Sequence, residues 1–302
     1  MASTRTSSRR WAAAELGPYA SFAADGSGNT TSTIRITSLA TSASVSDQFS
    51  DYGVILPAAA TDSNRQNRYV TSGPDSDGDI AVDRVFSATS VMDSATFEFH
   101  GVVKTLTEWD RYFNDALKRI MLPVEFTLSP ASVTATRHNL TTGQSWLVNH
   151  NWVRQVGWLA TNEVRADTDP YDRRAVRGGA YRESGTVYMY HPSKTFQTSD
   201  TIYVRAYKPA YSHVLPAAGG SYGSQTTGFA AEADEVPVSD ELLGYAALTE
   251  YARRAVGLLS GDAAKALREK QAEWASLFTY YYRIEVPRIP LAARSVLRVS
   301  IS

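Results

Sequence analysis

Three aspartates, Asp75, Asp77 and Asp79, alternate along a segment that also contains glycine and serine. Aspartates at alternate positions supply the oxygen ligands of calcium-binding loops. The EF-hand pattern, however, requires glycine at the sixth position and glutamate at the twelfth, and these positions hold Ile80 and Phe86. Glycine and aspartate at this density favour a polar hairpin turn between two strands. Whether the three carboxylates bind a cation stays open at this point.

A longer charged segment, residues 165–177, mixes aspartates and arginines at close spacing. Carboxylates beside guanidinium groups can perform acid–base chemistry or bind phosphate. Mixed signs at such short spacing are more typical of a solvated loop or a subunit contact. The candidate residues are Arg165, Asp167, Asp169, Asp172, Arg173, Arg174 and Arg177.

Other signatures of catalysis are missing from the sequence. None of its five histidines has a paired metal-binding spacing, and cysteine does not occur. A thiolate metal site and a cysteine nucleophile are therefore excluded. The sequence also lacks the glycine motifs of phosphate-binding loops, dinucleotide-binding folds and nucleophile elbows. We expect no enzyme activity, no catalytic residue, no bound metal and no cofactor.

Aromatic residues offer a different chemistry, because the 302 residues include 17 Tyr, 10 Phe and 6 Trp. Trp146, Trp152, Trp158 and Tyr188 lie in strand-forming segments. Rings in such positions can stack on a sugar, which would make the chain a carbohydrate-binding module. Such rings more often form the core and edge of a sheet, so both interpretations stand.

The hydrophobic pattern predicts the elements that must position these residues. In the first part, residues 1–123, a short helix over 8–16 ends at Gly17-Pro18. Short alternating segments then predict a small antiparallel sheet or barrel. These segments are 33–39, 51–56, 67–71, 79–86 and 95–100.

An amphipathic helix is expected over residues 105–122. Thr105 and Glu108 have the spacing of a capping box, and apolar residues follow at steps of three and four. Pro123 comes after the predicted end and blocks continuation of the helix. The apolar stripe requires a sheet or another helix to cover it.

The second part, residues 124–215, returns to a strand pattern, and its segments 185–190 and 201–207 are predicted to form a hairpin. A linker over 216–238 is rich in small residues and ends in acidic ones. Two helices over 239–282 form a helical hairpin. These elements predict an α+β fold: an antiparallel β-rich central region with an amphipathic helix, a C-terminal helical hairpin and an extended C-terminal arm.

The predicted C-terminal arm, residues 283–302, combines positive charge with apolar residues. It holds four arginines against Glu285 alone, a net charge of +3, and Pro287 and Pro290 forbid a regular helix at its start. An extended apolar terminus invites strand addition to another chain, so we expect the arm to bind a partner. The predicted contact residues are Arg283, Ile284, Arg288, Ile289, Arg294, Val296, Arg298 and Val299.

Several segments carry a resemblance to a known class of proteins. The run 67–73 (NRYVTSG), then 78–86 (GDIAVDRVF) and 98–100 (EFH), followed by an amphipathic helix, resembles a recurrent piece of tailed-phage virion proteins. Residues 236–248 (VPVSDELLGYAAL) resemble the closing helix of neck proteins. The chain is thus similar to the head-to-tail connectors, or adaptors, of tailed bacteriophages.

The resemblance implies a homo-oligomeric ring, typically of twelve subunits, that docks under the portal protein. Such a ring continues the DNA channel used in genome ejection and joins the tail or other neck proteins, and double-stranded DNA passes through it transiently. In adaptors of this kind the C-terminal arm commonly inserts between portal subunits. The extended backbone and the arginines of the present arm suit that role. The implied location is the virion neck, after synthesis in the host cytoplasm.

The overall charge agrees with this expectation. The chain has 30 Lys+Arg against 31 Asp+Glu, a net charge of −1. A conduit should not hold DNA tightly, and each Lys or Arg contact with phosphate adds affinity. No apolar stretch of about 18 residues occurs, so no membrane partner is expected. The alternatives are a tail, baseplate or head-decoration protein and, in another class, the carbohydrate-binding module.

Overall fold

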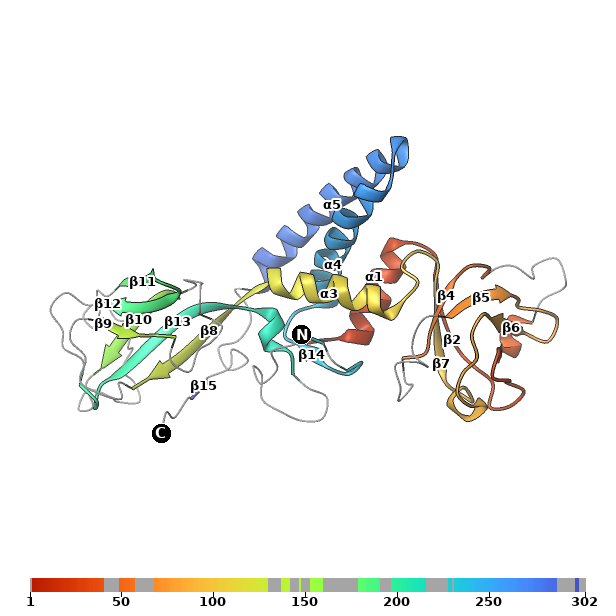
Figure 1. Ribbon diagram of the computed structural model, residues 1–302, viewed down its shortest axis with the longest axis horizontal. Helices are drawn as coiled ribbons and strands as arrows, with labels where there is room; N and C mark the ends of the chain where they lie inside the picture. Colours follow the sequence, from red (N-terminus) through yellow and green to blue (C-terminus); the bar gives the residue numbers. More distant parts are fainter. Residues whose placement is uncertain are drawn as a thin grey trace.

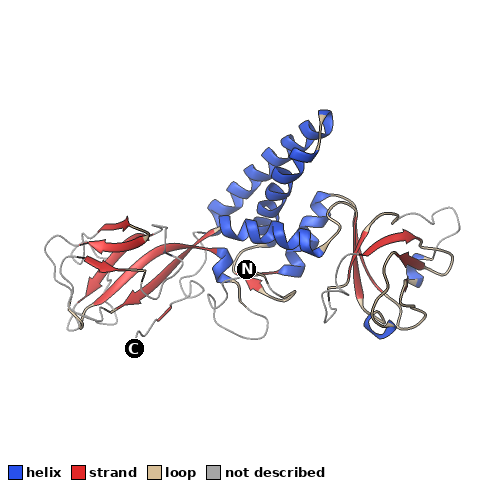
Figure 2. Cartoon of the chain, in the orientation of Figure 1, coloured by secondary structure: helices blue, strands red, loops and turns tan. Residues whose placement is uncertain are grey.

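The computed structural model describes most of the chain. The described residues are 2–40, 49–57, 68–129, 137–141, 147, 153–159, 179–190, 197–215, 228–229, 231–286 and 297–298. They form three hydrophobic cores. A helical centre lies between two β units, and a helical hairpin projects from it (Figure 1; Figure 2). The predicted α+β class is confirmed.

The first β unit is a six-stranded antiparallel sheet with the strand order β2-β7-β4-β5-β6-β3. Its strands are β2 (Tyr19–Ala23), β3 (Thr33–Arg35), β4 (Gly53–Ile55), β5 (Arg68–Ser72), β6 (Asp79–Val82) and β7 (Thr96–His100). Ile34, Ile80 and Phe97 are buried in its core, as expected for alternate residues of half-buried strands. The antiparallel sheet predicted for this region is therefore confirmed. Strand β2 was not predicted, because none of its side chains is fully buried and its pattern is weak.

Four α-helices of the described residues build the centre. They are α1 (Arg5–Leu16), α3 (Leu106–Arg119), α4 (Asp240–Ala255) and α5 (Gly261–Glu285). Helix α1 begins three residues earlier than predicted, because Thr4 caps it by accepting a hydrogen bond from the Ser7 amide. Helix α3 has the predicted cap at Thr105, and its stripe, including Trp109 and Phe113, is buried.

Helix α4 is the middle of this unit, because α1, α3 and α5 all pack against it. Gly244 lets the indole of Trp11 approach: a Cβ at this position would lie 2.2 Å from the Trp11 Cε3 atom. Helices α4 and α5 form the predicted helical hairpin, which projects from the centre (Figure 1). No helix of the described residues is both long enough and apolar enough to cross a membrane.

The second β unit is built on two long strands, β8 (Met121–Leu128) and β13 (Thr201–Pro209), that leave the helical centre (Figure 1). They lie in a four-stranded sheet with the order β10-β13-β8-β15. A second sheet has the order β11-β12-β9. The remaining strands of the unit are β9 (Arg137–Asn139), β10 (Val153–Leu159), β11 (Gly179–Glu183), β12 (Thr186–Tyr190) and β15 (Leu297–Arg298).

Two predictions for this region were wrong. Helix α3 ends at Arg119, and the chain passes directly into β8, which contains Pro123. Proline fits there because β8 pairs with β13 alone at this position, and β15 begins opposite Phe126. Residues 185–190 and 201–207 do not form a hairpin: β12 pairs with β11 and β9, whereas β13 pairs with β8 and β10.

The predicted linker over 216–238 is ordered at its C-terminal end. Glu235–Val236 form β14, which pairs antiparallel with β1 (Ser3–Thr4). The Arg5 amide also donates to the Asp234 carbonyl at 3.2 Å. This end therefore fastens the N-terminus rather than joining two independent parts. Residues 216–227 of the linker lie outside the described residues.

Candidate functional site

Buried charged groups join helix α1 to strand β7. The side chains of Arg9 and Glu98 are both fully buried. The Arg9 Nε donates to Glu98 Oε2 at 2.8 Å and its Nη2 donates to Oε1 at 3.2 Å, while Nη1 donates to Glu232 at 2.8 Å. A two-point contact between guanidinium and carboxylate fixes the orientation of both groups. The helix is therefore held in one position on the sheet.

The electrostatics of Glu98 follow from its partners. Burial opposes its ionisation, but the Arg9 charge and the hydrogen bonds with His100 and Arg9 outweigh burial and hold the pKa of Glu98 below its usual range. Burial lowers the pKa of His100 despite the 3.2 Å contact between its Nε2 and Glu98. Burial and the Glu98 charge raise the pKa of Tyr19 to about 12. Arg10, with 41% of its side chain exposed, donates to Glu98 at 2.8 Å from the surface.

A second pair extends this arrangement to helix α3. Arg5 Nε donates to Asp110 Oδ1 at 2.7 Å, and an Arg5 Nη1 lies 3.5 Å from Glu232. Burial raises the pKa of Asp110 although Arg5 opposes that shift. We name Arg5, Arg9, Glu98, Asp110 and Glu232 the ionic cluster. Each of its carboxylates is paired with an arginine, so the cluster fastens segments together and offers no free acid or base for catalysis.

Sequence reasoning missed the ionic cluster. Its members come from α1, β7, α3 and the segment before β14, and no local pattern marks a buried arginine. The one visible signal was the pair Arg9-Arg10 inside a short helix that is otherwise rich in alanine. A pair of adjacent arginines is too common on surfaces to have been diagnostic.

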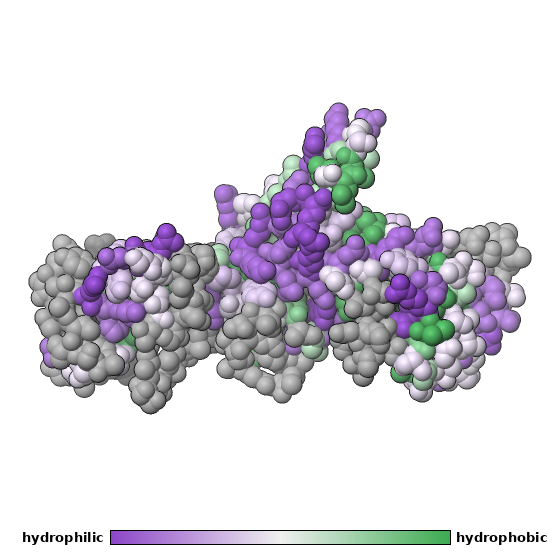
Figure 3. Space-filling view, viewed as in Figure 1, coloured by the Kyte–Doolittle hydropathy of each residue, from purple (hydrophilic) through white to green (hydrophobic). Residues whose placement is uncertain are grey.

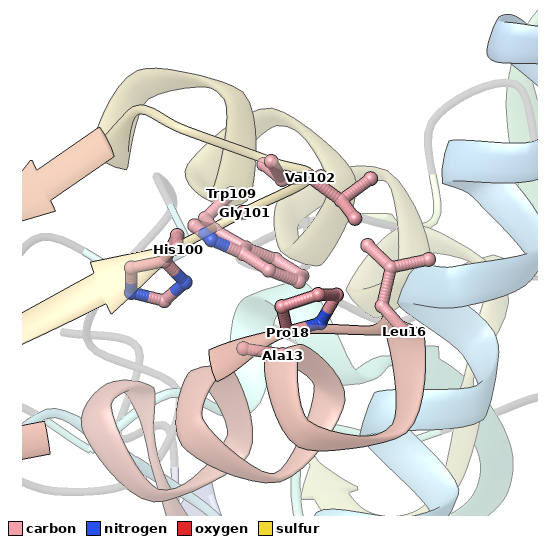
Figure 4. A pocket seen from close by; sticks show the side chains of 8 residues that line it. Ala13, Leu16, Pro18, His100, Gly101, Val102 and Trp109 are labelled. Atoms are coloured by element: carbon pink, nitrogen blue, oxygen red, sulfur yellow. The ribbon is translucent and has the colours of Figure 1, made fainter. Parts of the chain in front are cut away.

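A small cleft lies beside the ionic cluster, between the end of α1 and the turn after β7 (Figure 4). Its lining residues are Ala13, Leu16, Pro18, His100, Gly101, Val102, Val103 and Trp109. Its empty volume is at most ≈ 150 Å³ with open solvent included, whereas ligand pockets usually measure about 300–1,000 Å³. The rings of His100 and Trp109 lie 5.9 Å apart in it. The cleft is too small to serve as a substrate site.

The three alternating aspartates form a turn, as the turn chemistry indicated. Asp75 Oδ1 accepts hydrogen bonds from the amides of Asp77 and Asp79 at 2.9 Å. These backbone hydrogen bonds, that of Asp79 first, lower the pKa of Asp75. Arg35 donates two hydrogen bonds of 2.7 Å to Asp79. Among the described residues, no three histidine or acidic side chains are grouped so that they could hold a metal ion.

The other predicted candidates are only partly described. Residues 165–177, Trp146 and Trp152 lie outside the described residues, and Trp158 belongs to β10. Tyr188 of β12 stacks on Tyr181 with centroids 5.7 Å apart. The Arg137 guanidinium lies 4.7 Å from the centre of the same ring. Tyr188 is therefore engaged by neighbours within its own sheet.

The predicted contact residues of the arm fall into three groups. Arg283 and Ile284 lie in the last turn of α5, so the prediction of an extended arm from residue 283 was wrong. The helix continues because Glu285 accepts hydrogen bonds from the Ser239 amide at 3.0 Å and hydroxyl at 2.5 Å. Arg298 lies in β15. Arg288, Ile289, Arg294, Val296 and Val299 lie outside the described residues.

One further buried pair escaped sequence reasoning. Lys208 at the end of β13 and His213 just after it are 3% and 1% exposed. Burial lowers the pKa of Lys208 to about 8, and burial together with the Lys208 charge lowers the pKa of His213 to about 3. Neither ring nitrogen of His213 has a hydrogen-bond partner in the described part of the chain. The pair makes folding sensitive to pH.

Comparisons with known proteins add no relative. No protein-family model, no curated protein and no solved structure matches the chain.

Proposed function

We propose that this protein is a head-to-tail connector of a tailed bacteriophage, a structural virion protein that forms a ring under the portal, continues the DNA channel and joins the tail. The proposal starts from the resemblance of segments 67–100 and 236–248 to virion neck proteins. It assigns the chain neither catalysis nor a cofactor.

One structural observation supports it above the others. Leu297–Arg298, near the C-terminus, form β15, which pairs parallel with Phe126–Thr127 at the edge of β8. This terminal region is therefore able to add as a strand to a sheet edge. Strand addition by a terminal segment is a general mode of docking on another protein. On the portal, arginines of the same region would pair with acidic side chains.

The docking segment begins later than the sequence suggested. Glu285 is bound to Ser239, and Val286 is 5% exposed. We therefore define the terminal segment as residues 287–302, which contain three arginines and no acidic side chain. A deletion must spare residues up to 286, because removing Glu285 would damage the helical hairpin.

The test is a deletion of residues 287–302 in the full chain. We expect the truncated protein to keep its circular dichroism spectrum and melting temperature, to lose co-sedimentation with its portal, and to be missing from virions. A variant with Arg288, Arg294 and Arg298 changed to lysine is the control for charge, and we expect it to bind more weakly but measurably, since lysine lacks the two-point contact of arginine.

Three results would contradict parts or all of this assignment. Normal portal binding and virion assembly by the truncated protein would refute the role of the terminal segment. An intact chain that binds no portal but is found in purified tails would favour the tail or baseplate alternative. An intact chain that binds neither portal nor tail would refute the neck proposal as a whole.

A further inference from the structure

Helices α1, α4 and α5 present a row of aromatic rings on one side of the helical centre. The Trp11 ring meets Tyr245 edge-on with centroids 4.8 Å apart, and Tyr245 stacks on Tyr281 at 5.7 Å. Tyr280 continues the row, 5.4 Å from Tyr281, and is 59% exposed. Trp11, Tyr245 and Tyr281 are partly exposed. We name these four residues the aromatic face.

Helix α5 widens this face with aliphatic residues. Leu277 and Ile284 are partly exposed and lie four residues before and three residues after Tyr281, so they share its side of the helix. Trp274 and Phe278 lie seven and three residues before Tyr281, so they belong to the same stripe of α5, and this stripe packs against the helical core. Tyr280, which is 59% exposed, and the partly exposed Leu277 and Ile284 leave apolar surface uncovered beside this packed stripe, and uncovered apolar surface marks an interaction site.

Acidic side chains border the aromatic face. Glu15, Glu241 and Glu273 come from the same three helices, and their charges, after burial, contribute to a raised pKa of Tyr245. Two cations accompany these three carboxylates: Lys270, which pairs with Glu273 at 2.9 Å, and the exposed Arg283, three residues after Tyr280. The border keeps an excess of negative charge. A partner that fits this face should bring positive charge around an apolar contact.

The opposite side of the helical centre carries positive charge. Arg254 follows Tyr245 by nine residues, which is two and a half turns of α4, so the two side chains point to opposite sides. Helix α3 packs on the Arg254 side, where Figure 3 shows a hydrophilic surface. The cations there are Arg111, Lys118, Arg119, Arg253 and Arg254, which we name the basic face.

The basic face keeps an excess of positive charge after its internal pairs are counted. Asp115 pairs with Lys118 and Arg254, and Glu250 pairs with Arg119 and Arg253. Four of the five cations thus share two carboxylates, Arg111 is the fifth cation, and Glu108 is a third acid at the start of α3. Arg111 and Lys118 are both exposed and lie seven residues apart, which places them on one stripe of the helix.

We propose that the aromatic face of one chain binds the basic face of a second copy of this chain. The two faces are complementary in charge, and arginine on tyrosine and tryptophan rings adds cation–π attraction. Tyrosine, tryptophan and arginine are also the residues that dominate the energetics of interfaces. Because the faces differ and lie on opposite sides of α4, the contact is head-to-tail and produces a ring when the rotation closes. The inference rests on the proposed function and names the contact between neighbours in that ring.

The experiment uses two full-length variants, each with one face disabled. The first carries Leu277→Ser and Tyr280→Ser on the aromatic face, and the second carries Arg111→Glu and Lys118→Gln on the basic face. Val85→Ser, which removes a side chain of similar exposure (64%) in the first β unit, is the matched control. Sedimentation velocity up to about 1 mM protein measures association, and circular dichroism verifies the fold of each variant.

We expect the wild type and the control to associate, and each variant alone to associate at least about 30-fold more weakly. An equimolar mixture of the two variants should form dimers but no larger oligomers. The first variant supplies an intact basic face and the second an intact aromatic face, and the disabled faces of the dimer cannot bind a third chain. The proposal is overturned by a wild type that is monomeric throughout, by variants that associate normally, or by a mixture that stays monomeric. A chain that associates in this pattern but binds no portal would refute the neck proposal and leave this inference standing. Normal portal-bound rings formed by each variant on its own would refute this inference and leave the neck proposal standing.

Discussion

Replacing Glu98 with glutamine tests whether the ionic cluster holds α1 on the first β unit. Glutamine keeps the shape of the side chain but removes the negative charge that Arg9 faces at 2.8 Å, with both side chains fully buried. Arg9 then keeps Glu232, which is 15% exposed and also 2.8 Å away. Removing one partner of a buried ion pair costs about 3–5 kcal/mol. Because Glu232 remains, we expect a loss near the lower end, about 3 kcal/mol of the free energy of unfolding.

Urea unfolding at pH 7 is the assay, followed by tryptophan fluorescence and by circular dichroism. Trp11, Trp109 and Trp274 belong to the helical centre, so fluorescence reports on the unit that contains α1 once Trp146, Trp152 and Trp158 are replaced with phenylalanine in wild type and variants alike. Three cores need not unfold together, and the comparison therefore uses the transition in which fluorescence changes. Arg10→Ala is the matched control, because Arg10 contacts the same carboxylate from a side chain that is 41% exposed. We expect it to cost less than about 1 kcal/mol.

The effect of Glu98→Gln should also depend on pH. Folding lowers the pKa of Glu98. The ionised Glu98 therefore contributes its full stabilisation above the carboxyl pKa of the unfolded chain, about 4.3, and this contribution is lost as the pH falls through the pKa of Glu98 in the folded chain. The difference between wild type and variant should shrink below about pH 4. A loss under about 1 kcal/mol at pH 7, or equal losses for Glu98→Gln and Arg10→Ala, would refute the reasoning.

Trp109→Ala should lower the free energy of unfolding by about 3–5 kcal/mol, because Trp109 is 1% exposed and stacks on Phe113 with centroids 5.8 Å apart. An unchanged melting temperature would contradict the burial of this helix stripe. His213 has a folded pKa of about 3 against an ordinary value of 6.5, so the unfolded state binds more protons between these values and stability falls as the pH drops. The fall between pH 7 and pH 5 should be about 2 kcal/mol, and His213→Phe should remove it. Urea titrations at the two pH values measure this, and a variant with the wild-type slope would exclude His213 as the cause.

The sequence correctly predicted elements whose caps and apolar spacing lie within a single segment. Helix α3 was recognised because its cap at Thr105 and its apolar stripe lie within one segment. Strand β3 was recognised because Ile34 and Ile36 alternate with polar residues, and β6 because its segment lies between turn signals at the spacing of short strands. The end of α3 was misplaced because Ile120 and Leu122 are apolar in a helix or a strand alike, and β13 decides between the two by pairing with Leu122.

Long-range contacts account for what the sequence did not reveal. The extension of α5 to Glu285 depends on Ser239, which lies 46 positions earlier. The buried pairs of Arg9 depend on residues 89 and 223 positions away. The wrongly predicted hairpin of residues 185–190 and 201–207 also reflects long-range contacts. Strands that are close in sequence often pair, but here β12 pairs with β9 and β13 pairs with β8.

Helix α1 connects the ionic cluster to the aromatic face. Its Arg9 is fixed to Glu98 of the first β unit, while Trp11, two positions later, belongs to the aromatic face. A neighbour bound at Trp11 is therefore held in a defined orientation relative to that β unit, since a bidentate buried ion pair leaves the helix little freedom to turn. In a ring assembled through the helical centre, every copy would carry its first β unit at the same angle. On the proposed ring, the cost of burying Arg9 would be understandable, because the ionic cluster would fix the angle of the first β unit where an apolar contact would allow the helix to slide.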